Sequence, residues 1–154
     1  EETMKMLQEI DSPDDAESWV KDRLARKQKI MGFGHRVYKK GDSRVPIMRE
    51  LARQLGRRFG QEHWVPVCER LEAVMQREKQ LCANVDLYAA PVFHLLGIPS
   101  ELNTPIFACS RVSGWCAHVI EQHEHNRLIR PRSLYTGPAR RVYQPRGQGK
   151  GPKL

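Results

Sequence analysis

Residues 32–44 form the first group of side chains that can take part in chemistry. Within thirteen residues they combine Gly32, Gly34, one histidine (His35) and four bases, the last of which is Arg44. Glycines two residues apart allow positive φ angles and a close approach of the backbone to a ligand. Backbone amides, an imidazole and an arginine fork can together hold a phosphate or a carboxylate. A basic surface loop between two helices has the same composition, so the spacing alone leaves both interpretations open.

Two further charged residues have local sequences that suggest a function. Asp86 lies in Asn84-Val-Asp-Leu-Tyr88, at the expected start of a helix. A carboxylate there usually caps the helix, whereas in a closed pocket it can act as a general base. Arg111 is a lone charge in the apolar run from Pro105 to Ala117. A buried guanidinium needs a partner, so Arg111 forms either a structural ion pair or a clamp for an anionic ligand.

The spacing of histidines and cysteines argues against a metal site. His118, His123 and His125 include no pair four residues apart, and no Cys-x-x-Cys occurs, whereas zinc sites need such spacing. We therefore expect no metal and interpret these histidines as surface or packing residues. The cysteines stand in apolar or helical surroundings, which predicts buried side chains, a reducing compartment and a cytoplasmic location. They are Cys68, Cys82, Cys109 and Cys116.

The net charge of +8 comes entirely from the end of the chain. Eight Lys or Arg residues and no acid follow Asn126, so residues 1–126 carry 18 bases and 18 acids. A basic excess invites a nucleic-acid interpretation. No recognition motif accompanies it here, and a solvated tail is the default for such a segment. No run approaches the roughly 18 apolar residues of a membrane span. We expect neither a nucleic-acid nor a membrane partner.

The elements that must position these residues all have helical periodicity. Apolar residues recur at spacings of three and four, and alternating strand patterns are absent, so the predicted fold is all-α. The expected helices cover about 12–29, 46–59, 66–79, 86–97 and 104–125. Ser12 is expected to cap the first with its hydroxyl. The predicted buried stripe of the second is Ile47, Leu51, Leu55 and Phe59, and that of the third is Val67, Leu71, Val74 and Met75.

Five blocks of sequence, in order, resemble signature blocks of the citrate synthase family. They are Met31-Gly-Phe-Gly-His-Arg-Val-Tyr-Lys39, Asp42-Ser-Arg44, Asn84-Val-Asp-Leu-Tyr88, Phe107 to His118 and Ile129 to Gly137. The nine residues from His35 to Arg44 and the twenty-five from Asp86 to Arg111 are also similar to the family's spacings. The resemblance implies a small CoA-facing helical domain over 1–104, C-terminal elements of the large helical domain over 105–137, and a disordered basic tail over 138–154.

The resemblance also implies an activity, namely condensation of acetyl-CoA with oxaloacetate and thioester hydrolysis to citrate and CoA. The coenzyme A thioester is then a substrate, and no cofactor is expected. Asp86 would remove the methyl proton, and His35 would polarise and protonate the oxaloacetate carbonyl. Arg44, Arg111 and Arg130 would bind substrate carboxylates, the last across the interface of a homodimer. The implied CoA contacts are Met31, Gly32, Phe33, Gly34, Lys39 and Lys79.

Two departures from the family pattern leave alternatives open. The family's second catalytic histidine belongs to a block that precedes a helix like the one at Glu1, and that block is absent from these 154 residues. We therefore expect a C-terminal portion that does not condense by itself. Asp42-Ser-Arg44 resembles 2-methylcitrate synthases, which use propionyl-CoA, whereas Asn84 to Tyr88 resembles citrate synthase proper. The remaining alternatives are a non-catalytic helical module with a polyanion-binding tail and a degenerate regulatory homologue.

Overall fold

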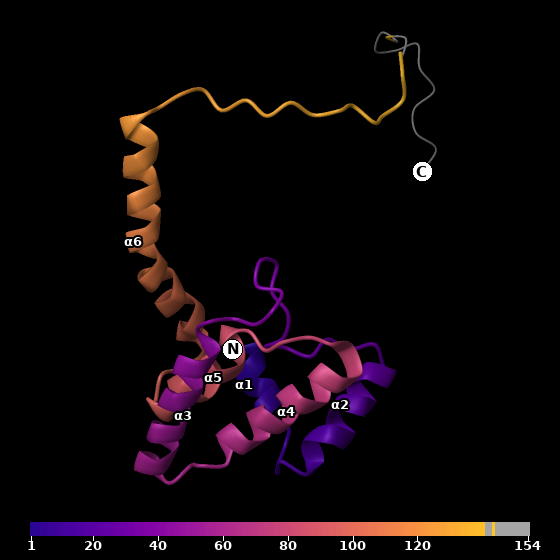
Figure 1. Ribbon diagram of the computed structural model, residues 1–154, viewed down its shortest axis with the longest axis vertical. Helices are drawn as coiled ribbons and strands as arrows, with labels where there is room; N and C mark the ends of the chain where they lie inside the picture. Colours follow the sequence, from indigo (N-terminus) through magenta and orange to yellow (C-terminus); the bar gives the residue numbers. More distant parts are fainter. Residues whose placement is uncertain (141–142, 144–154) are drawn as a thin grey trace. The chain divides into compact units, whose positions relative to one another are not determined.

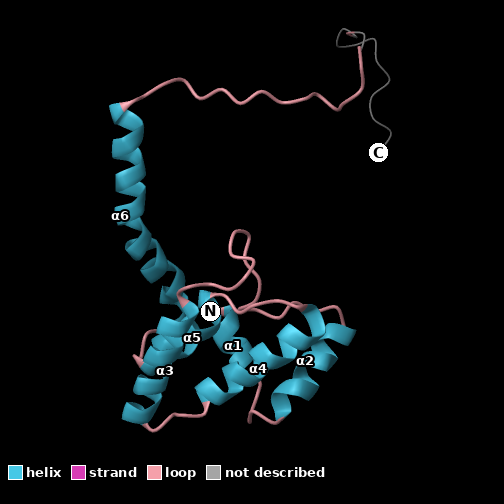
Figure 2. Ribbon diagram, in the orientation of Figure 1, coloured by secondary structure: helices cyan, strands magenta, loops and turns pink. Residues whose placement is uncertain are grey.

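The computed structural model describes residues 1–140 and 143, and its regular structure is helical (Figure 1, Figure 2). The helices are α1 (Glu2–Leu7), α2 (Asp15–Ala25), α3 (Val45–Phe59), α4 (Trp64–Lys79), α5 (Val85–Leu95) and α6 (Asn103–Glu124). A 3₁₀ turn, η1 (Ser100–Leu102), precedes α6. The described residues contain no strand, only an isolated bridge between Phe33 and Ala83. The predicted all-α fold is confirmed.

The hydrophobic core lies where α4 and α5 meet α1, α2 and α3. Leu71 of α4 and both Leu87 and Tyr88 of α5 are fully buried, together with Leu7 of α1 and Val20 of α2. α3 packs along α5, and α2 packs along α4. Burial of one such side chain stabilises the fold by roughly 1.5–3 kcal/mol. α5 is therefore firmly held, and its first turn is a fixed place for a functional side chain.

The ends of α3 and α5 follow local sequence signals. Pro46 lies in the first turn of α3, where its missing amide hydrogen costs nothing. Gly60 ends α3 with a left-handed φ of 67°, a backbone conformation that glycine adopts without strain. Gly97 follows α5 with a φ of 70°. These signals explain why the expected and observed ends of these helices agree closely.

The start of α2 differs from the predicted cap. The Ser12 hydroxyl donates to the Asp15 carboxylate at 2.5 Å, and no side-chain cap satisfies the backbone at the start of this helix. Residues 12–16 instead form a turn, in which the amides of Asp15 and Ala16 donate to the carbonyls of Ser12 and Pro13. Because that turn already satisfies the first amides, α2 begins at Asp15 without a capping hydroxyl.

α3 turns a different side to the core from the one its sequence predicts. Ile47 is 65% exposed, Leu51 41% and Phe59 49%, so the predicted buried stripe is wrong at these three positions, whereas Leu55 is half-buried and packs against the core. The buried side carries smaller residues, namely Val45, Ala52 and Gly56. Ala52 packs with Val65 of α4 and Val92 of α5. Three helices approach one another closely there, which favours small side chains and leaves the larger ones outside. The stripe predicted for the next helix, by contrast, is buried in α4.

The prediction of buried cysteines holds for only one of the four. Cys68 is buried, Cys82 is half-buried, and Cys109 and Cys116 are exposed. Desolvation raises the pKa of the Cys68 thiol well above its ordinary value. Cys109 and Cys116 lie on α6, which has no buried residue. Their exposure is therefore a property of the whole helix, which the local apolar pattern did not reveal.

The chain divides into two compact units, residues 1–115 and 116–154. In the second unit, the described residues that follow the end of α6 at Glu124 form no regular secondary structure. The predicted boundaries after residues 104 and 137 stay predictions. The predicted basic tail, 138–154, lies outside the described residues except for 138–140 and 143. Within the described part of the chain, no helix is long and apolar enough to cross a membrane.

Candidate active site

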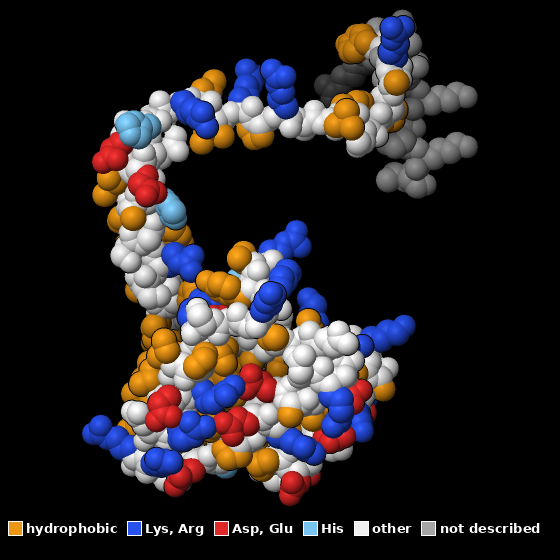
Figure 3. Space-filling model, in the orientation of Figure 1, with side chains coloured by type: hydrophobic (Ala, Val, Ile, Leu, Met, Phe, Trp, Pro, Cys, Tyr) orange, Lys and Arg blue, Asp and Glu red, His pale blue; other side chains and the backbone are white. Residues whose placement is uncertain are grey.

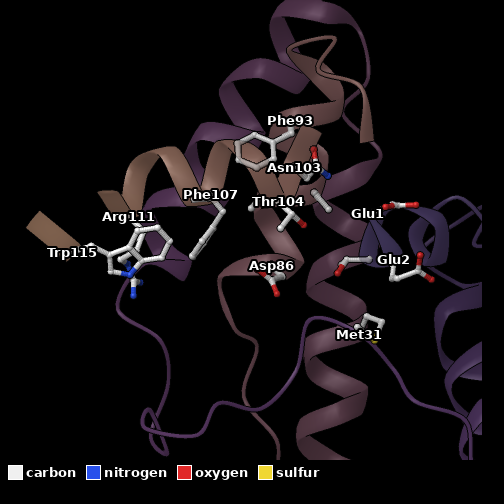
Figure 4. Close-up of a pocket in the computed structure, with 14 residues that line it drawn as sticks. Glu1, Glu2, Met31, Asp86, Phe93, Asn103, Thr104, Phe107, Arg111 and Trp115 are labelled. Atoms are coloured by element: carbon white, nitrogen blue, oxygen red, sulfur yellow. The ribbon is translucent and has the colours of Figure 1, made fainter. Parts of the chain in front are cut away.

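A pocket of about 640 Å³ lies beside the first turns of α5 and α6 (Figure 4). Three predicted site residues line it: Met31 from the loop after α2, Asp86 from α5 and Arg111 from α6. All the residues of its wall belong to the compact unit 1–115. Glu1 and Glu2 line it as well, so residues distant in sequence place three carboxylates and one guanidinium around one cavity.

The wall of the pocket is mainly apolar. Phe107, Arg111 and Trp115 occur every four residues along α6, so their side chains share one side of the helix. Figure 4 shows Phe107, Arg111 and Trp115 following one another along α6, with Phe107 the nearest of the three to Phe93 of α5. The Arg111 guanidinium lies over the Phe107 ring, 5.9 Å from its centroid. Arg111 is exposed to the pocket rather than buried, so a structural ion pair in the core is excluded. The arrangement suits a clamp for an anionic ligand.

At the start of α5, the residue that caps the helix and the candidate base are two different residues. The Asn84 side chain accepts a hydrogen bond from the Asp86 amide at 3.0 Å and caps the helix. The interpretation of Asp86 as the cap is therefore wrong, because Asn84 already performs that role. The Asp86 carboxylate is exposed and lies at the pocket wall. A carboxylate at this position can accept a proton from a ligand in the pocket.

His35 is held with one ring nitrogen turned toward its own loop. Its Nδ1 atom accepts hydrogen bonds from the amides of Val37 at 3.0 Å and Tyr38 at 3.1 Å. A neutral imidazole that accepts at Nδ1 carries its hydrogen on Nε2. The Tyr38 ring also lies 4.6 Å from the His35 ring, centroid to centroid. The loop thus leaves Nε2–H as the donor that His35 can offer to a ligand.

The loop that contains His35 ends in an ion pair whose carboxylate is buried. The Asp42 carboxylate receives hydrogen bonds from Arg44 Nε at 2.9 Å and Arg44 Nη2 at 2.7 Å. The Arg44 side chain thereby lowers the pKa of Asp42 to about 2, from an ordinary 3.8. Asp42 in turn raises the pKa of Arg44, and Asp86 adds a smaller attraction in the same direction. Arg44 is half-buried, and its charge acts on the first turn of α5.

The glycine loop is attached directly to the segment before α5. The Gly34 amide donates to the Cys82 carbonyl and the Asn84 amide donates to the Gly32 carbonyl, each at 2.9 Å. The Asn84 side chain also donates to the Gly34 carbonyl, at 2.9 Å. Gly32 has a φ of +85°, and a Cβ there would lie 3.0 Å from Leu87 Cβ. Only glycine fits this approach, which places the Met31–His35 stretch beside Asp86.

Other predicted site residues do not line the pocket. His35 and Arg44 belong to the adjoining loop, and Lys39 donates from Nζ to the His35 carbonyl at 3.1 Å. Lys79 is exposed at the end of α4, and Arg130 is exposed in the second compact unit. The roles of Lys39, Lys79 and Arg130 stay predictions. Lys and Arg side chains nevertheless gather on the loop between α2 and α3 (Figure 3).

The described residues offer no ready-made metal centre. No group of three or more His, Cys, Asp or Glu side chains in that part of the chain is placed to hold a metal ion. His118 lies against Glu121, with 3.2 Å between Nδ1 and the nearer carboxylate oxygen. The side chains that line the pocket and its adjoining loop supply carboxylate, imidazole and guanidinium groups.

Sequence reasoning missed two kinds of residue at this site. Phe107 and Trp115 form much of the apolar wall, and their spacing of four from Arg111 was a usable signal. Asp42 joins Arg44 to α5, and although it belongs to the block Asp42-Ser-Arg44, it was not predicted as a site residue. Together these features define an all-helical domain whose pocket combines carboxylates, a guanidinium and an apolar wall.

Comparison with known sequences shows the family of this domain. Residues 1–132 match the family model described as "Citrate synthase, C-terminal domain", and the chain belongs to the citrate synthase family. It is 49% identical to citrate synthase 2 of Bacillus subtilis over 94% of its own length and 39% of that protein. It is 45% identical to 2-methylcitrate synthase 1 of Corynebacterium glutamicum, over 92% of the chain and 37% of that protein.

Solved structures of the same family share the fold. Citrate synthase from Thermotoga maritima matches with a TM-score of 0.75 at 42% identity, over 94% of this chain and 40% of that one. A second match is citrate synthase from Thermoplasma acidophilum, solved in ternary complex with carboxymethyl coenzyme A and oxaloacetate. Its TM-score is 0.79 at 38% identity, over 93% of this chain and 40% of that one. The chain therefore spans about two fifths of the length of these relatives and structures.

Proposed function

We propose that this chain is the C-terminal, CoA-facing portion of an enzyme that condenses an acyl-CoA with a 2-oxo dicarboxylate and hydrolyses the resulting thioester. The observation that carries the proposal is the pocket that places Asp86 and Arg111 on facing elements. Membership of the citrate synthase family and the Thermoplasma complex with a CoA analogue and oxaloacetate support the substrate classes. The enzyme is proposed to act as a cytoplasmic homodimer, with Arg130 reaching the neighbouring subunit's site.

Asp86 is the proposed base. The methyl group of an acyl thioester is a very weak acid, so a carboxylate needs help from a group that stabilises the enolate as it forms. The apolar side chains of Phe107 and Trp115 line the same pocket as Asp86, and closure of the site over them would exclude water and strengthen such electrostatic effects. The stabilising group is proposed to come from a second histidine outside these residues, which is why the chain alone is expected to be inactive.

His35 and two arginines are proposed to handle the other substrate. The Nε2–H left free by the Nδ1 hydrogen bonds of His35 donates to the 2-oxo carbonyl and protonates it as the new carbon–carbon bond forms. Arg44 and Arg111 hold the two carboxylates, since a guanidinium binds a carboxylate with two parallel hydrogen bonds. Met31 to Gly34, Lys39 and Lys79 are proposed to contact coenzyme A.

A hybrid enzyme tests the proposal. Residues 1–154 would replace the matching C-terminal part of Bacillus subtilis citrate synthase 2, and thiol release would be measured with acetyl-CoA and oxaloacetate. We expect turnover by the hybrid and none by the isolated chain. Asp86→Asn should lower kcat of the hybrid by about 10²–10⁴-fold, whereas Asp22→Asn, which changes an exposed acid of α2 paired with Arg26, should not. A hybrid in which Asp86→Asn keeps full turnover would contradict the proposal.

Propionyl-CoA is a second candidate substrate. The relatives include 2-methylcitrate synthase 1 of Corynebacterium glutamicum and a citrate/2-methylcitrate synthase of Bacillus subtilis, which is 51% identical over 90% of the chain. One methylene changes binding by roughly 1–3 kcal/mol. The ratio of kcat/KM for the two acyl-CoA substrates in the hybrid decides between them, with a preference of about tenfold or more expected for the physiological one.

A further inference from the structure

Asp42 is a buried carboxylate whose hydrogen-bonding capacity is fully used. It is 4% exposed. Oδ1 accepts from the Arg44 amide at 3.1 Å and from Arg44 Nε at 2.9 Å. Oδ2 accepts from Arg44 Nη2 at 2.7 Å and from the Val85 amide at 3.1 Å. A carboxylate has about four acceptor positions, so these four bonds fix its orientation completely.

The same bonds fix the orientation of the Arg44 guanidinium. Of its five N–H groups, two are bound to Asp42, and three remain for a ligand. The Tyr38 ring lies over the guanidinium at 5.7 Å, centroid to carbon, and restricts the plane of the group. The side chain of Arg44 is 36% exposed. Asp42 therefore decides which edge of the guanidinium is free to bind a carboxylate.

The fourth bond of Asp42 reaches the helix that presents the candidate base. Val85 is the first residue of α5 and precedes Asp86 directly. The bond from its amide joins two segments that lie 43 residues apart in sequence. One carboxylate thus holds both the arginine of the loop and the first turn of α5. A negative charge is also favourable at the N-terminus of a helix.

We infer that Asp42 is a positioning residue that sets Arg44 and Asp86 relative to each other for the condensation. The inference rests on the proposed function, because it gives Arg44 the role of binding the dicarboxylate and Asp86 that of the base. Asp42 touches neither substrate in this scheme. It acts by presenting three N–H groups of Arg44 on the side of the loop that adjoins the first turn of α5.

Kinetics of the hybrid enzyme provide the first test. We expect Asp42→Asn to lower kcat/KM for the 2-oxo dicarboxylate by about 10²-fold, the typical effect of a misplacement near 1 Å. The increase in KM should fall on the dicarboxylate and not on the acyl-CoA. If Asp42→Asn does not fold, Asp42→Glu keeps the charge, moves it by one methylene and should show the same split between substrates.

Glu72→Gln is the matched control. Glu72 accepts hydrogen bonds from Arg49 of α3 and from the Tyr88 hydroxyl of α5, so it also ties α5 to its neighbours without touching a predicted site residue. Loss of stability alone should therefore appear in Glu72→Gln as well, with KM for the dicarboxylate unchanged. Equal KM values for the hybrid with Asp42→Asn and without it, while the hybrid turns over, would overturn the inference.

Hydrogen exchange of the 154-residue chain separates this inference from the proposed function. In Asp42→Asn, the Val85 amide should exchange about tenfold faster or more, while the Asn84 amide, which donates to the Gly32 carbonyl, keeps its rate. An unsubstituted hybrid without activity would count against the proposed function only. Unchanged exchange at Val85 would overturn the positioning role whatever the hybrid does.

Discussion

At the scale of single residues, Asp42 makes the stability of the domain depend on pH. Its pKa of about 2 lies below the ordinary value of 3.8, first because the Arg44 side chain donates to it. A carboxylate whose pKa is lower in the folded state contributes stability that is present above its unfolded pKa. That contribution is lost as the pH falls from about 4 toward 2.

Urea unfolding of the chain between about pH 2 and pH 6 checks this dependence. The free energy of unfolding should exceed that of Asp42→Asn most above about pH 4, where the lowered pKa contributes roughly 2 kcal/mol. The excess should shrink as the pH falls toward about 2 and below, because folded Asp42 then takes up a proton and loses its charge. Asp22→Asn serves as the control, since Asp22 is an exposed acid of α2. A difference that stays constant over this range would contradict the prediction.

At the scale of elements, the contact between the glycine loop and α5 has no space for a side chain. Alanine at Gly32 would place Cβ 3.0 Å from Leu87 Cβ and 3.1 Å from Leu87 Cα. The φ of +85° also disfavours any residue with a Cβ. Gly60 is a suitable comparison, because its φ is +67° but nothing lies within 4 Å of the position that a Cβ would take there.

Gly32→Ala and Gly60→Ala therefore separate backbone strain from steric conflict. We expect Gly60→Ala to lower the free energy of unfolding by about 1–2 kcal/mol, the cost of the left-handed backbone. Gly32→Ala should lower it by a further 1–3 kcal/mol or so, because the backbone of α5 must move. Urea unfolding of both variants checks the order. Equal losses would show that the loop can shift away from Leu87 freely.

The elements also show how far the sequence could predict this fold. Helix ends at Gly60 and Gly97 follow from local chemistry, and so does the buried stripe of α4. The buried side of α3 could not be predicted from the local sequence, because α3 has two apolar sides and only the packing around Ala52 selects between them. Asp42 and Val85 likewise meet through a fold that brings distant segments together. Periodicity reports that a helix has an apolar side, but not which neighbour covers it.

At the scale of the whole molecule, α6 exposes a series of large apolar side chains. Val112 is 47% exposed, Trp115 54%, Val119 57% and Ile120 60%. The hydrophobic side chains along this helix are visible in Figure 3. Large apolar side chains exposed in this number along one helix mark an interaction site or cause aggregation. The chain also spans only about two fifths of the length of Bacillus subtilis citrate synthase 2 and of the Thermotoga maritima enzyme.

Self-association of the isolated chain is the expected consequence. Because apolar burial drives association at roughly 25 cal/mol per Å², the purified 154-residue chain should sediment as species larger than its 17.8 kDa in a concentration-dependent way. Val119→Lys together with Ile120→Lys should weaken that association by about tenfold or more, since a charge is costly to bury. Ile47→Lys, which changes an exposed residue of α3, tests whether α6 is the surface responsible. Sedimentation velocity of the three proteins at matched concentrations decides. A monomeric parent chain, or equal association of all three proteins, would show that the exposed apolar side chains of α6 do not drive self-association.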